Sequence, residues 1–151
     1  NDVMQLANTL LANSSNEEYD IFIVERYTNA ASQRGRSIYN DNLAWFLGVN
    51  NGNYGFKSGS LVDDNAVDAG TSWHIANGMS NGSGQETFYV NGVLNATATG
   101  GDSAPSSLTI GSTNSDLEIA EILIQVGGYA GFPCAVDGFR QAREVFKEKG
   151  I

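Results

Sequence analysis

The sequence is short of cysteine, histidine and basic residues, and these shortages exclude several classes of function. A single cysteine rules out an intrachain disulfide and a zinc site built on several thiolates. Eight lysines and arginines stand against 17 aspartates and glutamates, which gives a formal net charge of −9. Because a surface of that sign repels phosphate backbones, the sequence argues against nucleic-acid binding.

Long apolar runs are also missing. No stretch approaches the roughly 20 apolar residues of a membrane-spanning helix, and no signal peptide is visible. The chain begins at Asn1 rather than at a methionine, which leaves the earlier removal of a signal open. With 151 residues, 41% of them hydrophobic and 17% charged, the chain is long enough for one globular domain with a real core. Its 18 glycines indicate many tight turns.

What the sequence does contain is a series of strand patterns separated by turns rich in glycine and asparagine. The clearest is 19–27, whose apolar residues on both faces predict burial on both sides. Further strands are expected at 37–49 (two strands), 56–68, 71–79 and 108–111. Asn91 and Gly92 lie between two apolar runs and predict a hairpin with a type I′ turn, because both central residues need φ > 0. Strands at this spacing without intervening helices predict an antiparallel sandwich.

Four motifs follow one another in an order that resembles the LamG-like, concanavalin A-type jelly roll. They are Trp73-His74, the hairpin Phe88 to Val93, Leu108 to Gly111, and Ile119 to Ile122. The resemblance covers residues 18–124. It implies a jelly-roll sandwich with a noncatalytic role that binds glycans or proteins through its loops, often with a calcium ion. Such modules act outside the cell, on a virion or on a cell surface.

The end of the chain, residues 115–151, resembles a different family, the carboxymuconolactone decarboxylases. The likeness is carried by residues 119–123, 125–126, 129–133, 139–140 and 142–146. That family is all-helical and oligomeric, so the resemblance implies a cytoplasmic chain that forms homo-oligomers through this segment. Its members use Glu and His on an upstream helix, or a Cys-x-x-Cys pair. The only cysteine here is Cys134 and the only histidine is His74, so we assign no catalytic residue.

Residue patterns in this segment predict two helices. Ser115 and Glu118 match a capping box, and Pro133 suits the first turn of a second helix. Apolar residues recur at helical spacing at Ile119, Ile122, Leu123 and Val126, and again at Val136, Phe139 and Phe146. The string 117–124 also fits the closing strand of the jelly roll. A helix is favoured there, because Glu121 interrupts the apolar face of a strand.

We therefore expect a mainly β fold, with an antiparallel jelly-roll sandwich over 1–114 followed by one or two α-helices over 115–151. Because the string 117–124 fits both families, it also suggests a chimera of two ancestries joined there.

Four aromatic residues are candidates for ligand binding, namely Trp45, Tyr54, Trp73 and His74. Aromatic rings can stack on sugars, but on a sandwich strand they are more often core residues. A lone histidine without a catalytic partner is likewise usually structural.

Asp63, Asp64 and Asp68 offer oxygen ligands for calcium. Their spacing is not that of an EF-hand loop, and solvated loop carboxylates are the alternative. The leading interpretation of the chain is a noncatalytic recognition module for a glycan or a surface protein. The alternative is a chain of the decarboxylase or peroxidase class that lacks the catalytic half of its family.

Overall fold

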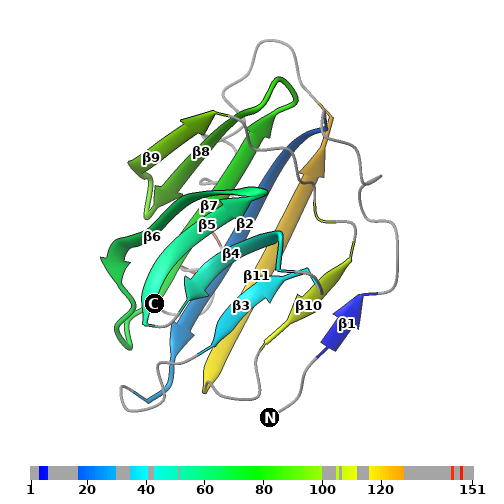
Figure 1. The fold of residues 1–151 in the computed structure, drawn as a ribbon. Coiled ribbons are helices and arrows are strands. Elements are labelled where there is room, and N and C mark those ends of the chain that lie inside the picture. The colour runs from blue at the N-terminus through cyan, green and yellow to red at the C-terminus, as the bar shows by residue number, and fades with distance from the viewer. Residues whose placement is uncertain are drawn as a thin grey trace.

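The computed structural model of the chain describes residues 4–6, 17–29, 35–40, 43–50, 52–99, 105, 107–111, 116–127, 144 and 147. Its β-strands form two antiparallel sheets that pack face to face (Figure 1). The strands are β1 (Met4–Leu6), β2 (Glu18–Tyr27), β3 (Arg36–Tyr39), β4 (Trp45–Asn50), β5 (Asn53–Ser58), β6 (Ser60–Asp68), β7 (His74–Asn81), β8 (Gln85–Val90), β9 (Val93–Thr99), β10 (Leu108–Ile110) and β11 (Leu117–Val126).

The six-stranded sheet, here sheet A, has the order β1-β10-β3-β4-β5-β6. The five-stranded sheet, here sheet B, has the order β11-β2-β7-β8-β9. Neighbouring strands are antiparallel throughout both sheets. The prediction of a mainly β, antiparallel sandwich is thus confirmed.

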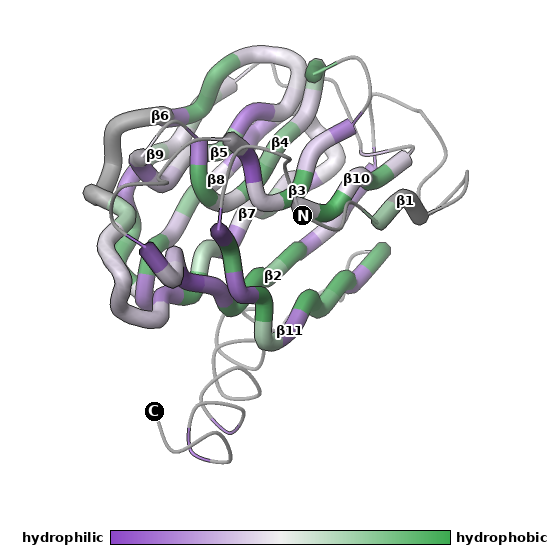
Figure 2. The backbone as a smooth tube through the Cα atoms, turned by 90° about the horizontal axis from the view of Figure 1, so that it is seen from below, coloured by the Kyte–Doolittle hydropathy of each residue, from purple (hydrophilic) through white to green (hydrophobic). Residues whose placement is uncertain are grey.

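The core lies between the sheets and is rich in aromatic rings. Trp45 is fully buried in it, with edge-on contacts to Tyr19 at 6.3 Å and to Phe56 at 6.1 Å between ring centroids. Such edge-to-face pairs place the positive ring edge against the negative face of the neighbour. Apolar residues alternate along β2, with Ile21 and Ile23 facing this core. Figure 2 shows how strongly hydrophobic positions predominate along β2 and β11.

The hairpin predicted at Asn91-Gly92 is confirmed. Both turn residues have positive φ, 52° at Asn91 and 82° at Gly92, which is the requirement of a type I′ turn. Asn91 also ties the turn to β7, because its N–H donates to the Ile75 carbonyl at 2.8 Å and its Oδ1 accepts the Ile75 N–H at 2.9 Å. The turn is therefore held beside the start of β7.

The helix predicted over 117–124 is wrong. These residues belong to β11, which pairs with β2 along its whole length. A bulge between Ile119 and Glu121 shifts the alternation of the strand by one residue. Apolar residues before and after the bulge therefore share the core face, and these are Leu117, Ile119, Ile122 and Ile124. The bulge places Glu121 opposite Val24, on the face away from the core, so the charged residue does not interrupt the core face. Pairing with the buried β2 outweighs the helical pattern.

The sandwich consequently continues past residue 114 to Val126. A chimera joined at 117–124 has no support, since this string is an integral strand of sheet B. The second predicted helix and Cys134 lie outside the described residues, apart from Glu144 and Lys147, which are helical and form an ion pair of 2.6 Å. Oligomerisation through 115–151 stays a prediction. In the described part of the chain, no helix is long and apolar enough to cross a membrane.

Candidate functional site

One end of sheet B brings together residues that are far apart in the sequence. The end of β2, the start of β7 and the start of β11 meet there, with Glu25 opposite His74 and Tyr27 opposite Leu117. The β8–β9 turn lies beside them through its bonds to β7. We call this surface the Trp73 end, defined by Arg26, Thr28, Trp73, His74, Asn91, Asp116 and Glu118.

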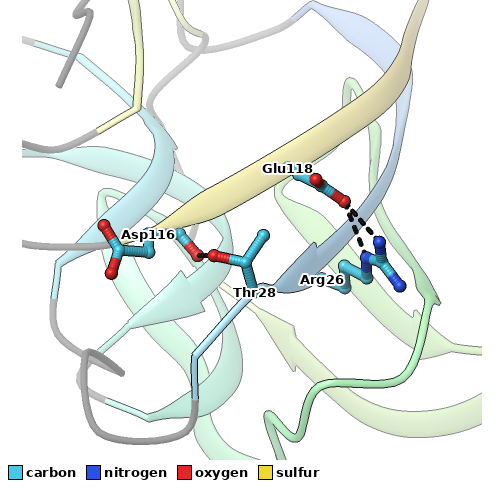
Figure 3. A network of polar contacts seen from close by, with 4 residues as sticks. All are labelled: Arg26, Thr28, Asp116 and Glu118. Carbon is cyan, nitrogen blue, oxygen red and sulfur yellow. Dashed lines mark hydrogen bonds and ion pairs between the residues drawn. The ribbon is translucent and has the colours of Figure 1, made fainter.

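Arg26 links the aromatic and acidic parts of the Trp73 end. Its guanidinium lies 4.8 Å from the centroid of the Trp73 ring and 2.7 Å from Glu118 Oε2. The stack on the indole is a cation–π contact, and it keeps the side chain directed along the surface. Figure 3 shows Arg26 reaching across to Glu118 on the neighbouring strand. The two charged side chains remain 37% and 48% exposed, so both stay accessible to a ligand.

Thr28 and Asp116 close the strand pair just beyond this ion pair. The Thr28 N–H donates to the Asp116 carbonyl at 2.8 Å, and the Thr28 hydroxyl donates to the same oxygen at 3.2 Å (Figure 3). Two donors on one carbonyl fix where β11 begins. The position of Glu118 beside Arg26 follows from that register.

His74 lies between the two sheets at the same end. Its ring packs on Tyr54 of sheet A with centroids 4.9 Å apart. The His74 Nδ1 is 2.8 Å from the Ser72 carbonyl oxygen. Because a carbonyl only accepts, Nδ1 carries the proton and donates in this contact. His74 therefore has a structural partner on each side.

Opposite His74, on β2, lies the buried carboxyl of Glu25. Glu25 has no exposed surface, and burial is the main reason that its pKa rises from 4.5 to about 8. Its Oε1 accepts the Val49 N–H at 3.1 Å, and the Ser37 Oγ accepts the same N–H at 2.8 Å. Glu25 is therefore a neutral hydrogen-bonding group at pH 7. At higher pH, where Glu25 is ionised, its negative charge adds to burial, the larger cause, in raising the pKa values of the Tyr27 and Tyr54 phenols.

Gly48 makes room for this carboxyl. Its φ of +97° is unfavourable for other residues, and a Cβ at this position would lie 2.9 Å from the Ser37 Cβ. Glycine here thus allows Ser37 and Glu25 to reach the amide of Val49. The Glu25 carboxyl is therefore part of the core of the sandwich and not of a surface site.

The structure separates the four aromatic residues predicted to bind a ligand. Trp73 and His74 are half-buried at the Trp73 end. Trp45 and Tyr54 are fully buried, and the Trp45 Nε1 donates to the Tyr19 hydroxyl at 3.0 Å. A ring enclosed in this way has no face open to a sugar. Trp45 and Tyr54 are therefore left out of the site proposed below.

The three candidate calcium ligands all fall on β6, one of the two edge strands of sheet A. Asp63 is half-buried and its backbone pairs with Phe56. The side chains of Asp64 and Asp68 are outside what the structure describes. Among the described residues, no group of three His, Cys, Asp or Glu side chains is placed to hold a metal ion.

Sequence reasoning missed Arg26 and Glu118. A signal was present, because Glu25 and Arg26 are adjacent charges that directly follow the apolar run 21–24 of the same strand. Neighbouring residues on a strand point to opposite faces, so one of the two had to be buried and the other outward. The partner of Arg26 was hidden by the assignment of Glu118 to a helix.

No protein-family model matches this sequence, and no curated protein matches it. Neither the LamG-like nor the decarboxylase resemblance is therefore supported by sequence comparison. Solved structures do match, and several of them are binding domains of botulinum neurotoxins. The binding domain of neurotoxin DC in complex with rat synaptotagmin II has a TM-score of 0.64 at 17% identity, over 95% of this chain and 40% of that one. The serotype D ligand binding domain in complex with N-acetylneuraminic acid has a TM-score of 0.64 at 15% identity, with the same coverage.

A third match comes from a study of botulinum neurotoxin type C, whose cell entry depends on interaction with two ganglioside molecules. Its TM-score is 0.60 at 18% identity, over 87% of this chain and 36% of that one. At these identities the likeness concerns the fold. The chain spans two fifths or less of the length of these structures. The class defined by the fold is thus a β-sandwich that also occurs within receptor-binding and glycan-binding domains.

Proposed function

We propose that the chain is a noncatalytic recognition module that binds a glycan at the Trp73 end. The observation that carries the proposal is the half-buried Trp73 beside an exposed arginine and glutamate. An indole offers an apolar surface to the C–H face of a sugar, while adjacent polar groups hold its hydroxyls. A rigid sheet end that presents both kinds of group suits this task, because little ordering is needed on binding.

The matched structures support the same role. Proteins that share this fold are seen with N-acetylneuraminic acid and with synaptotagmin II. A surface protein is accordingly the second candidate ligand, favoured by the complex with synaptotagmin. Both kinds of ligand fit a chain that acts outside the cell, on a virion or on a cell surface. We also propose, more specifically, that the sandwich is a LamG-like jelly roll.

Calcium is a further part of the proposal. Asp63, Asp64 and Asp68 lie on one edge strand, and carboxylates are the ligands that calcium prefers. Titration calorimetry with calcium chloride tests this, with Asp63→Asn as the variant. No heat of binding in the original chain would remove calcium from the proposal.

The decarboxylase or peroxidase alternative is not supported. No family model matches, and the string 117–124, which carried part of that resemblance, is a strand. The comparisons therefore give no support to the oligomeric, cytoplasmic chain that this family implies.

The test is a glycan array and a panel of surface proteins probed with the full chain. We expect binding to a glycan, and we expect Trp73→Ala to abolish it. The matched control is Leu61→Ala, which removes a side chain that is 48% exposed on the opposite sheet. Binding that persists in Trp73→Ala would place the ligand elsewhere, and binding to neither panel by the original chain would overturn the proposal.

A further inference from the structure

The sandwich has four edge strands, and three of them carry a feature that opposes pairing with another chain. Sheet A ends in β1 and β6, and sheet B ends in β11 and β9. β1 is only three residues long, β6 contains three aspartates, and β11 contains two glutamates. Short edges and charged edges both oppose the addition of a further strand. β9 has neither protection, because its seven residues, VLNATAT, include no charge and no proline.

The open edge of β9 presents a regular row of backbone groups. The two-residue turn between β8 and β9 makes Val90 and Val93 a hydrogen-bonded pair. Because backbone groups alternate in direction along a strand, every second residue of β8 before Val90 also bonds to β9. The partners of these residues on β9 are Ala96 and Ala98. The residues that alternate with them direct their N–H and C=O groups away from β8, and these are Asn95, Thr97 and Thr99.

No described strand pairs with this edge. β9 is the last strand of sheet B and lies at the border of that sheet in Figure 1. β6 of sheet A contacts β9 but forms no ladder with it. β9 is also apolar where it is most accessible, since Val93 is 65% exposed and Leu94 is 53% exposed. Exposed apolar surface beside unpaired backbone groups is typical of a strand that pairs with another chain.

The charge of the chain determines which partner fits this edge. Copies of a chain with a net charge of −9 repel one another, and pairing through β6 or β11 would bring their carboxylates close together. At β9 two copies meet without opposing charges. Two identical strands in antiparallel pairing are also self-complementary about a two-fold axis. A strand of seven uncharged residues offers no ion pair to a charged peptide, so a second copy is the partner that it fits best.

We propose that two copies of the chain form a dimer in which β9 pairs with β9 in an antiparallel ladder centred on Thr97. This register uses all the outward residues, because Thr97 pairs with Thr97 of the second copy and Thr99 pairs with its Asn95. Threonine pairs across strands are favourable. The two five-stranded B sheets become one sheet of ten strands. Because the copies are antiparallel, their Trp73 ends point in opposite directions, whatever those ends bind.

Sedimentation of the full chain over a range of concentrations tests the proposal. We expect a monomer–dimer equilibrium that shifts toward the dimer as sodium chloride is added, because salt screens the repulsion between two acidic copies. Thr97→Lys places two like charges opposite each other at the centre of the ladder, so this variant should stay monomeric. The matched control is Thr87→Lys on β8, which changes the net charge equally. Thr87 is the cross-strand partner of Thr97 and lies away from the edge, so the control should dimerise as the original chain does.

Cysteine cross-linking tests the register in a chain that also carries Cys134→Ser. Residues opposite each other in a hydrogen-bonded pair have Cα atoms about 5.5 Å apart, which a disulfide can span. Thr97→Cys should therefore form a covalent dimer on oxidation. Thr99→Cys should not, because its two copies lie four residues apart along the ladder, which is about 13 Å.

Three results would overturn the proposal. A chain that remains monomeric at all concentrations and salt levels has no such interface, and its β9 edge is then left for a peptide of another protein. A dimer that persists in a Thr97→Lys variant with unchanged β-sheet circular dichroism uses another surface. Cross-linking of Thr99→Cys as readily as of Thr97→Cys excludes the proposed register.

Discussion

Replacing Glu25 by glutamine should remove a pH dependence of stability that the fold builds into its core. The carboxyl is fully buried, with a pKa raised from 4.5 to about 8, mainly by burial. The folded chain therefore keeps a proton on Glu25 that the unfolded chain has already released. The resulting stabilisation is complete below about pH 4.5 and is lost as the pH rises to about 8.

The magnitude follows from the width of that interval. Each pH unit between the two pKa values lowers the free energy of unfolding by up to about 1.4 kcal/mol. Across the whole interval the loss attributable to Glu25 is on the order of 5 kcal/mol. Glutamine has the same shape and can still accept the Val49 N–H, but it does not titrate. The Glu25→Gln chain should accordingly lose much less stability between these pH values.

Urea denaturation at a series of pH values from 5 to 8.5 measures this directly. The matched control is Glu118→Gln, because that carboxylate is 48% exposed and pairs with Arg26 at the surface. The control should follow the original chain closely. If the free energy of unfolding falls with pH by the same amount in the original chain and in Glu25→Gln, the prediction of a neutral, buried Glu25 is refuted.

Three other predictions concern the backbone and the surface. Gly48→Ala forces a residue with a Cβ into φ +97°, and we expect a loss of about 2 kcal/mol or more in urea denaturation. Asn91→Ala should cost about 1–2 kcal/mol, because it loses both a tolerant positive φ and the bond to Ile75. Asn91→Gly, which keeps the φ, should recover part of that loss in the same assay. A double-mutant cycle on Arg26 and Glu118 should give a coupling below about 1 kcal/mol, and a larger value would contradict the exposure of the pair.

The class of the fold was predictable because its strand signals are local. The pattern of 19–27 and the Asn91-Gly92 turn each determine their own conformation, and both are confirmed. The segment 56–68 was expected as strand, but the structure divides the region into β5 and β6, with a sharp turn at Gly59 between them. A turn of one glycine inside a strand pattern is easily taken for a bulge.

The conformation of residues 117–124 was not predictable from the spacing of apolar residues alone. Its apolar residues fit a helix at least as well as an unbroken strand, and a bulge that resets the alternation is invisible in one sequence. The deciding factor is non-local: β2 presents a long apolar edge that β11 must cover. The Trp73 end was only half visible for the same reason. Trp73 and His74 stand out in the sequence, but the contact between Arg26 and Glu118 spans 92 residues.

The pairing of β2 with β11 also governs how and when the chain can fold. β2 is synthesised early, but one of its two edges stays unpaired until β11 has been synthesised, near the end of the chain. Pairings of such long range make folding slow, in the millisecond to second regime typical of β-sandwiches. Until then β2 is an open, apolar edge of the kind that templates aggregation. A fragment that stops at residue 114 would keep that edge permanently, so stable expression of this sandwich requires the chain to run at least through Val126.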